Sequence, residues 1–362
     1  MTQHTTHPES TGQGRKLAVV VVGLAALVIL MLCAFALPSV NSGPHDLPVG
    51  VTGSAQATAA VEHALAGDEW DVTTYDDEAA LKSAMKDRDV MGGFALTPGH
   101  LTVYTATAGG TQPTAAVTAL AHGMAEQQRA EVTVTDLEPF PADDPKGAGF
   151  SAAAFPMIFG GMIPAVLLTR LFPGHFGLRR RLTGGVAFAL VAGFAVTAFL
   201  QFGTGSLDGD YLLSGLGMSL GMAALVMTLL GLEALLGMAG FGLGAVVVML
   251  LGNPLSGLAS GPHWLPGGWA TLGQILPPGA SGSLLRANAF FDGTGAGTPA
   301  LVLGCWAVFG LALMVIADRR GPRTAAAEPG TRAQLVRPAR AERPVGTGAG
   351  RQDDGGAPQD LR

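Results

Sequence analysis

The side chains that commonly carry out chemistry are scattered along this sequence rather than grouped. Eight histidines run from His4 to His263, and none has a second histidine and a partner carboxylate at the spacing of a metal site. Ser206 and Ser219 have no obvious general base nearby in the sequence. We therefore predict that the chain is not an enzyme and binds no cofactor or metal. A site assembled from distant residues stays open as the alternative.

ATP hydrolysis through a phosphate-binding loop is excluded more firmly. Such a loop needs Gly-Lys-Ser/Thr, whose lysine and hydroxyl reach the phosphates and magnesium. The lysines are Lys16, Lys82, Lys86 and Lys146, and none of them follows a glycine. If the chain performs ATP-driven work, the ATPase must be a different chain.

Glu233 is the one carboxylate embedded in a long apolar stretch, Tyr211 to Leu251. An ionisable group inside a membrane is a functional candidate by default. The stretch is too long for a single span, so we expect a helical hairpin that turns near Glu233–Gly240. Glu233 would then lie at the membrane interface, where its charge reaches water. The alternative is a buried relay.

The composition indicates a membrane protein. Only 13% of the residues are charged and 48% are hydrophobic, whereas a soluble domain has about 25% charged residues. Both cysteines, Cys33 and Cys305, fall inside apolar runs, so we expect no disulfide in an exported domain.

Six apolar runs are long enough to cross the hydrocarbon core, which takes about 20 residues. They are Leu17–Leu37, Ser151–Leu171, Leu182–Phe202, Tyr211–Leu232, Ala234–Leu251 and Thr298–Ala317. Basic clusters precede the first run, separate the second from the third, and follow the sixth. The positive-inside rule then places both termini in the cytoplasm of a multi-pass protein of the cell membrane. Cleavage of the first run as a signal peptide, after Ala34-Phe35-Ala36, is the alternative to an uncleaved anchor.

Residues 38–149 differ in character from the apolar runs and should lie outside the cytoplasm. They read as β-α-β-α-β-β-α-β, with Asp76 or Asp77 capping a helix, Thr97-Pro98-Gly99 as a turn, and Pro113 opening another helix. The predicted fold is thus an α-helical multi-pass membrane protein. Six transmembrane helices carry a small α/β extracytoplasmic domain inserted between helices 1 and 2.

The predicted domain boundaries follow from these runs. Residues 1–16 form a cytoplasmic tail, 17–37 the first helix, 38–149 the α/β domain, 150–318 a five-helix transmembrane domain, and 319–362 a disordered cytoplasmic tail.

The segment between the fifth and sixth runs is too apolar for a soluble loop and too rich in breakers for a spanning helix. We predict that 252–297 forms a broken, partly re-entrant element at the outer mouth, with "GWATLGQIL" as about two helical turns. An ordinary interfacial loop is the alternative. The residues that define the element are Pro254, Gly257, Pro262, Trp264, Pro266, Trp269, Pro277 and Gly279.

This layout resembles the permease subunits of type-2 ATP-binding cassette exporters, including the phage-infection-protein-like branch common in actinobacteria. The resemblance covers residues 15 to about 323. It rests on the first span followed by "ALPSVNSGPHDLPVGVTGS", the large outer domain, the five clustered spans, and "LGNPLSGLASGPHWLPGGWATLGQILPPGASGSLLRANAFFDG" before the last span.

The resemblance implies a function and partners. The chain would be a permease subunit that exports a hydrophobic or amphipathic substrate, contacts membrane lipid, pairs as a homodimer or heterodimer of permeases, and binds no nucleic acid. A separate ATP-binding cassette ATPase would contact the loop "RLFPGHFGLRRR", through Arg170, Arg179, Arg180 and Arg181. The alternative is a non-transporting surface protein whose outer domain binds a ligand or partner.

Overall fold

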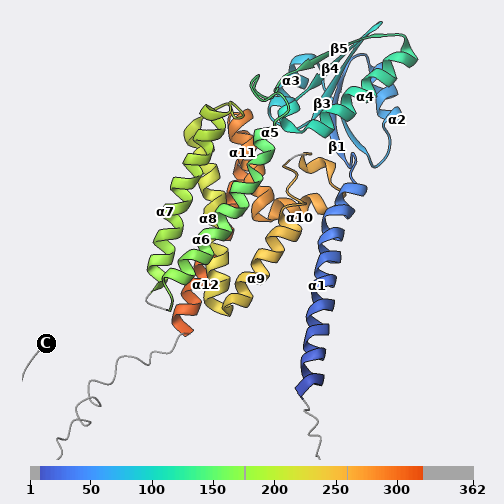
Figure 1. Cartoon of the computed structure of the whole chain (residues 1–362). Coiled ribbons are helices and arrows are strands. Elements are labelled where there is room, and N and C mark those ends of the chain that lie inside the picture. The colour runs from blue at the N-terminus through green and yellow to red at the C-terminus, as the bar shows by residue number, and fades with distance from the viewer. Residues whose placement is uncertain (1–8, 175–176, 259, 321–362) are drawn as a thin grey trace, which may run out of the picture. The chain divides into compact units, whose positions relative to one another are not determined.

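The computed structural model describes residues 9–174, 177–258 and 260–320 (Figure 1). The described residues are mostly helical, and a small sheet lies in sequence between the first long helix and the others. The tails predicted at 1–16 and 319–362 lie outside the described residues, except for 9–16 and 319–320, which belong to helices.

Five strands form the sheet in the segment where an α/β domain is predicted. They are β1 (Leu47–Thr52), β2 (Trp70–Thr74), β3 (Gly92–Thr97), β4 (His100–Thr105) and β5 (Glu131–Asp136). The order across the sheet is β2-β1-β3-β4-β5, in which β3 and β4 form an antiparallel hairpin and the other described pairs are parallel. Helices α2 (Ala55–Ala64), α3 (Glu78–Lys86) and α4 (Thr111–Gln128) connect the strands, which confirms the predicted element order.

Local signals account for where these elements begin and turn. Asp77 caps α3, since its side chain accepts a hydrogen bond from the backbone N–H of Ala80 at 2.8 Å. Gly99, with φ of 78°, supplies the left-handed residue of the β3–β4 turn. Pro113 is the third residue of α4, which begins at Thr111, so the expectation that Pro113 opens the helix was wrong by two positions.

Helices cover both faces of the sheet, with α3 on one side and α2 and α4 on the other (Figure 1). The adjacent residues Gly92 and Gly93 of β3 point to opposite faces. A Cβ at Gly92 would meet Val117 of α4, and one at Gly93 would meet Leu81 of α3. On the α2/α4 face a buried apolar cluster forms around Val49, Phe94 and Val103.

Within the described ranges, five helices are long and apolar enough to cross a membrane, judged by length and composition. Helices α1 (Glu9–Val40), α8 (Tyr211–Leu236) and α12 (Gly297–Arg320) are three of them. The fourth is α6 (Ala154–Leu171), which follows directly on the short α5 (Ala148–Ala152), and the fifth is α7 (Leu178–Ala198), which continues as a π-helical turn over Phe199–Gly203. Each overlaps one of the predicted spans.

The predicted span Ala234–Leu251 is shorter in the structure. Helix α8 ends at Leu236, and Gly237, with φ of 68°, makes the turn inside the expected range. Helix α9 (Met238–Val247) and a π-helical turn over Val248–Gly252 then give 15 apolar residues. At about 1.5 Å per residue this is roughly 22 Å, less than the ~30 Å hydrocarbon core. Crossing by a sixth span therefore stays a prediction.

Helix α8 is the central helix of the bundle and packs against α6, α7, α9, α11 (Pro277–Phe290) and α12 (Figure 1). Small residues permit the close approach of α12. A Cβ at Gly310 would collide with the backbone of Met227 and Thr228, and one at Gly231 would collide with the backbone of Gly310. Helix α1 differs sharply, because no residue in its most apolar window is buried.

Candidate functional site

The α6–α7 connection divides the four arginines of the predicted ATPase contact into two groups. Arg170, at the end of α6, and Arg179 and Arg180, in the first turn of α7, are exposed. Arg181 is buried, with 6% of its surface exposed. The structure thus leaves three of these side chains on the surface and turns the fourth into the protein.

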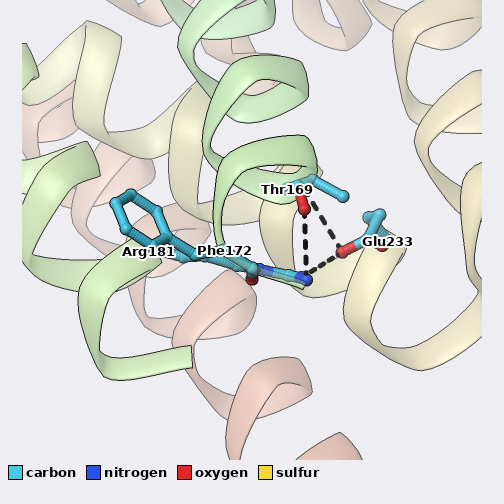
Figure 2. Close-up of polar contacts among 4 residues, drawn as sticks. All are labelled: Thr169, Phe172, Arg181 and Glu233. Carbon is cyan, nitrogen blue, oxygen red and sulfur yellow. Dashed lines mark hydrogen bonds and ion pairs between the residues drawn. The ribbon is translucent and has the colours of Figure 1, made fainter. Parts of the chain in front are cut away.

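Arg181 forms an ion pair with Glu233 of α8 (Figure 2). The Nη1 atom of Arg181 lies 2.6 Å from Oε2 of Glu233. Its Nε donates to the carbonyl of Phe172 at 2.7 Å, and its Nη2 donates to the carbonyl of Thr169 at 3.5 Å. The Thr169 hydroxyl donates to the same carboxylate oxygen at 3.4 Å. All three nitrogens of the guanidinium are therefore used.

The pair ties the start of α7 and the end of α6 to the central helix. The side chains of Arg181 and Glu233 are only 7% and 14% exposed, so the attraction between them is weakly screened. Glu233 lies one helical turn before Gly237, at the end of α8 where the hairpin turn was expected. Sequence reasoning noticed both charges but did not pair them.

A cavity of about 250 Å³ adjoins this ion pair. Its lining includes Gly174 of the α6–α7 connection, Arg181, Glu233, Gly237 and Asp318 of α12. The α6–α7 connection, the α8–α9 turn and the end of α12 thus meet at one end of the bundle. The basic residues Arg179, Arg180, Arg319 and Arg320 belong to these same elements.

The predicted outer element is a chain of short helices. A 3-10 turn over Pro262–Trp264, helix α10 (Trp269–Ile275) and helix α11 follow one another, and α10 supplies the two turns expected of "GWATLGQIL". The sequence did not predict α11 as a regular helix. Its first residues are Pro277 and Pro278. Proline suits the first turn of a helix because the backbone N–H that it lacks would have no partner within the helix there.

Each residue that defines this element has a structural place. Gly257, with φ of 64°, packs against Pro262, and the carbonyl of Trp264 accepts a hydrogen bond from Gly43 N–H at 3.1 Å. Gly279 lies against the backbone of Gly273. The remaining defining residues stand at turns and helix starts: Pro254 in the turn after Gly252, Pro266 before α10, Trp269 at its first residue, and Pro277 at the start of α11.

Two arginines that sequence reasoning did not assign lie beside phenylalanine rings near this element. Arg286 of α11 is 2% exposed, donates from Nη2 to the carbonyl of Leu258 at 2.7 Å, and lies 4.9 Å from the Phe150 ring centroid. Arg88, between α3 and β3, donates to the carbonyl of Thr294 at 3.2 Å. Burial lowers the pKa of Arg88. The sequence did contain a signal that singles out Arg286, because it is the one arginine in residues 252–286.

The sequence prediction that the chain carries no metal and no catalytic site stays a prediction. Among the residues that the structure describes, no group of three or more His, Cys, Asp or Glu side chains is placed to hold a metal ion.

Over the residues that the structure describes, the fold is mostly helical, with five helices long and apolar enough for a membrane and a small sheet. Comparison of the chain with protein-family models, with curated proteins and with solved structures finds no match. The resemblance to exporter permeases therefore stays a prediction from the sequence.

Proposed function

We propose that the chain is the permease subunit of an ATP-binding cassette exporter. It moves a hydrophobic or amphipathic substrate across the cell membrane, and a separate ATPase supplies the energy. Two permease subunits, identical or different, form the transporter, and both termini are cytoplasmic. The apolar helices support the membrane location, and the absence of a Gly-Lys pair in the sequence requires that the ATPase be another chain.

The observation that carries the proposal is that the arginines of the α6–α7 connection differ in burial: three are exposed and one is buried in an ion pair. Arg170, Arg179 and Arg180 are exposed and available to acidic groups of a soluble partner. Arg181 is buried and paired with Glu233, on the helix that packs against most of the bundle. A force applied to the exposed arginines would therefore reach α8 through a charged, hydrogen-bonded contact.

The shared end of the bundle supports the proposed orientation. The α6–α7 connection and the end of α12 line one cavity, so the basic residues on both lie on the same side. The positive-inside rule assigns that side to the cytoplasm, where an ATPase would be found.

Substitution of arginine by lysine tests this function. In the Arg179→Lys/Arg180→Lys variant the positive charge that sets orientation is kept, but lysine lacks the planar, multi-donor geometry of arginine. We expect ATPase association and transport to fall while membrane insertion stays normal. The matched control is Arg319→Lys/Arg320→Lys, which changes two basic residues at the same end of the bundle and should leave association unchanged.

The alternative, a surface protein whose outer domain binds a ligand, predicts a different outcome. Neither pair of substitutions would then alter any partner's binding, and topology would be the only role of these arginines. That result would reject the coupling role of Arg179 and Arg180.

A further inference from the structure

Two cavities beside α10 and α12 adjoin one another. The first, of about 600 Å³, is bordered by α10, the residues before it, the start of α12, and His45 and Asp46. The second, of about 420 Å³, runs along α12. Ile275 of α10 and Val302 of α12 line both cavities, so the two spaces lie next to one another at these side chains. Each volume lies within the 300–1,000 Å³ range of small-molecule sites.

The two cavities differ in chemistry. The lining of the first, called the polar cavity below, is mainly apolar in surface but includes polar side chains, among them Asp46, His263, Thr271, Gln274 and Thr298. The described lining of the second is wholly apolar apart from one thiol: Ile275, Leu301, Val302, Cys305, Trp306 and Phe309. A molecule that occupies both spaces therefore finds hydrogen-bonding side chains mainly in the first.

Together the two cavities extend along α12 by about half the thickness of the hydrocarbon core. Thr298 lines the polar cavity in the first turn of α12, and Phe309 lines the far end of the apolar one. These residues are eleven positions apart, which at about 1.5 Å per residue is roughly 16 Å along the helix. The hydrocarbon core is about 30 Å thick, so the two cavities together span about half of that thickness.

Trp306 builds the wall of the apolar cavity. Its indole Nε1 donates to the carbonyl of Ile275 at 2.7 Å, which joins α12 to the end of α10. The one hydrogen-bond donor of the indole is therefore satisfied, and its ring offers an apolar surface. The Phe309 ring packs edge-on against it, with centroids 5.6 Å apart.

The polar cavity favours a headgroup that donates hydrogen bonds. Asp46 is the one acid in its described lining, which includes no lysine or arginine. The Nδ1 atom of His45 lies 2.9 Å from the carbonyl of Gly43 and must donate to it, so the Nε2 atom of the neutral ring accepts. An anionic headgroup would find no lysine or arginine in that lining and would lie beside the Asp46 carboxylate, although the charge of Arg88 reaches His263 from outside the lining.

We propose that the two cavities form one site for a membrane amphiphile whose headgroup bears hydroxyl or ammonium donors and no net negative charge. Its chain lies along Leu301, Trp306 and Phe309, and its headgroup lies beside His45 and Asp46 in the leaflet on that side. The claim that this amphiphile is the exported substrate rests on the proposed function. The claim that the amphiphile binds in these cavities does not rest on it.

Quenching of Trp306 fluorescence tests the site without any ATPase. In the full chain carrying Trp70→Phe, Trp264→Phe and Trp269→Phe, Trp306 is the one remaining tryptophan. The protein is placed in phosphatidylcholine nanodiscs with a few mole per cent of a probe whose acyl chain is brominated. The probes are a monoglucosyl diacylglycerol, a long-chain primary amine, and phosphatidylglycerol.

We expect saturable quenching by the glucosyl lipid or the amine, at a lower mole fraction than by phosphatidylglycerol. Val302→Phe, which fills the junction of the cavities, should abolish the preference. Val308→Phe, the same change at an exposed position of α12 outside both cavities, should keep it. Asp46→Asn distinguishes the two headgroups. The preference for the amine should fall about two- to fivefold, which is the effect of losing an exposed ion pair. The preference for the glucosyl lipid should be kept.

Two outcomes would overturn the site. Equal, unsaturable quenching by all probes would mean ordinary boundary lipid. Absence of quenching, together with disulfide cross-linking of Cys305 between two chains, would mean that a second copy covers the groove. If the tryptophan variant does not fold, native mass spectrometry of the unchanged chain tests the same site. It counts the lipids of each class that the protein retains. Either failure leaves the ATPase association measured with Arg179 and Arg180 unaffected.

Discussion

Replacing Glu233 by leucine should destabilise the protein strongly. The substitution leaves Arg181 buried, with its Nη1 atom deprived of the carboxylate that lies 2.6 Å away. The carbonyls of Phe172 and Thr169 still accept from the other two nitrogens, but neither neutralises the charge. The penalty is therefore that of an uncompensated buried cation rather than that of one lost hydrogen bond.

The expected magnitude follows from the burial of the pair. Removing one partner of a buried ion pair costs about 3–5 kcal/mol, whereas replacing both partners with apolar residues is often close to neutral. A unit of 150–250 residues loses about 2–4 °C of Tm per kcal/mol. Glu233→Leu should thus lower the apparent Tm by roughly 6–20 °C.

A double-mutant cycle checks this reasoning. The Tm of the purified protein in detergent is measured for Glu233→Leu, Arg181→Met and the combined variant. We expect each single change to destabilise and the double variant to recover most of the loss, because no buried charge is left unpaired. A double variant whose loss equals the sum of the two single losses would refute the pairing.

Three further predictions concern topology, the sheet domain and the helix contact. In intact cells a cysteine introduced at His100 should react with an impermeant thiol reagent and one at Pro173 should not; the reverse pattern would overturn the orientation. Residues 44–145 expressed alone should unfold cooperatively with a mixed α/β circular dichroism spectrum, and a random-coil spectrum would reject an independent domain. Gly310→Val should cost about 1–3 kcal/mol by overpacking at the α8–α12 contact, whereas Gly304→Val, at a position where an added Cβ meets nothing within 4 Å, should leave the Tm nearly unchanged.

The sheet domain was predictable because its signals are local. Alternating residues mark the strands, Asp77 caps α3, and Gly99 permits the hairpin turn. The five long apolar helices were predictable for a related reason, since the length of an apolar run is visible without knowledge of its neighbours. Gly237 also falls where the length of the apolar stretch requires a turn.

The contacts between distant segments were not predictable. Arg181 and Glu233 are 52 residues apart, and nothing in their local sequence shows that they face one another. Helix α11 carries Pro277, Pro278, Gly279 and Gly282, which local propensity assigns to a loop. Most of its residues are buried among other helices, and that packing overrides their low propensity. The cavity at Val302 likewise depends on how α10 lies against α12.

The most direct test of the account is ATP-driven transport by the reconstituted protein. The full chain is placed in proteoliposomes with and without a P-loop ATPase that co-purifies with it, and movement of a labelled amphiphile between leaflets is followed after ATP is added. The account predicts movement only when both chains and ATP are present, and its loss in the Arg179→Lys/Arg180→Lys variant. ATP-dependent movement by the chain alone, or none with an ATPase bound and hydrolysing ATP, would contradict it.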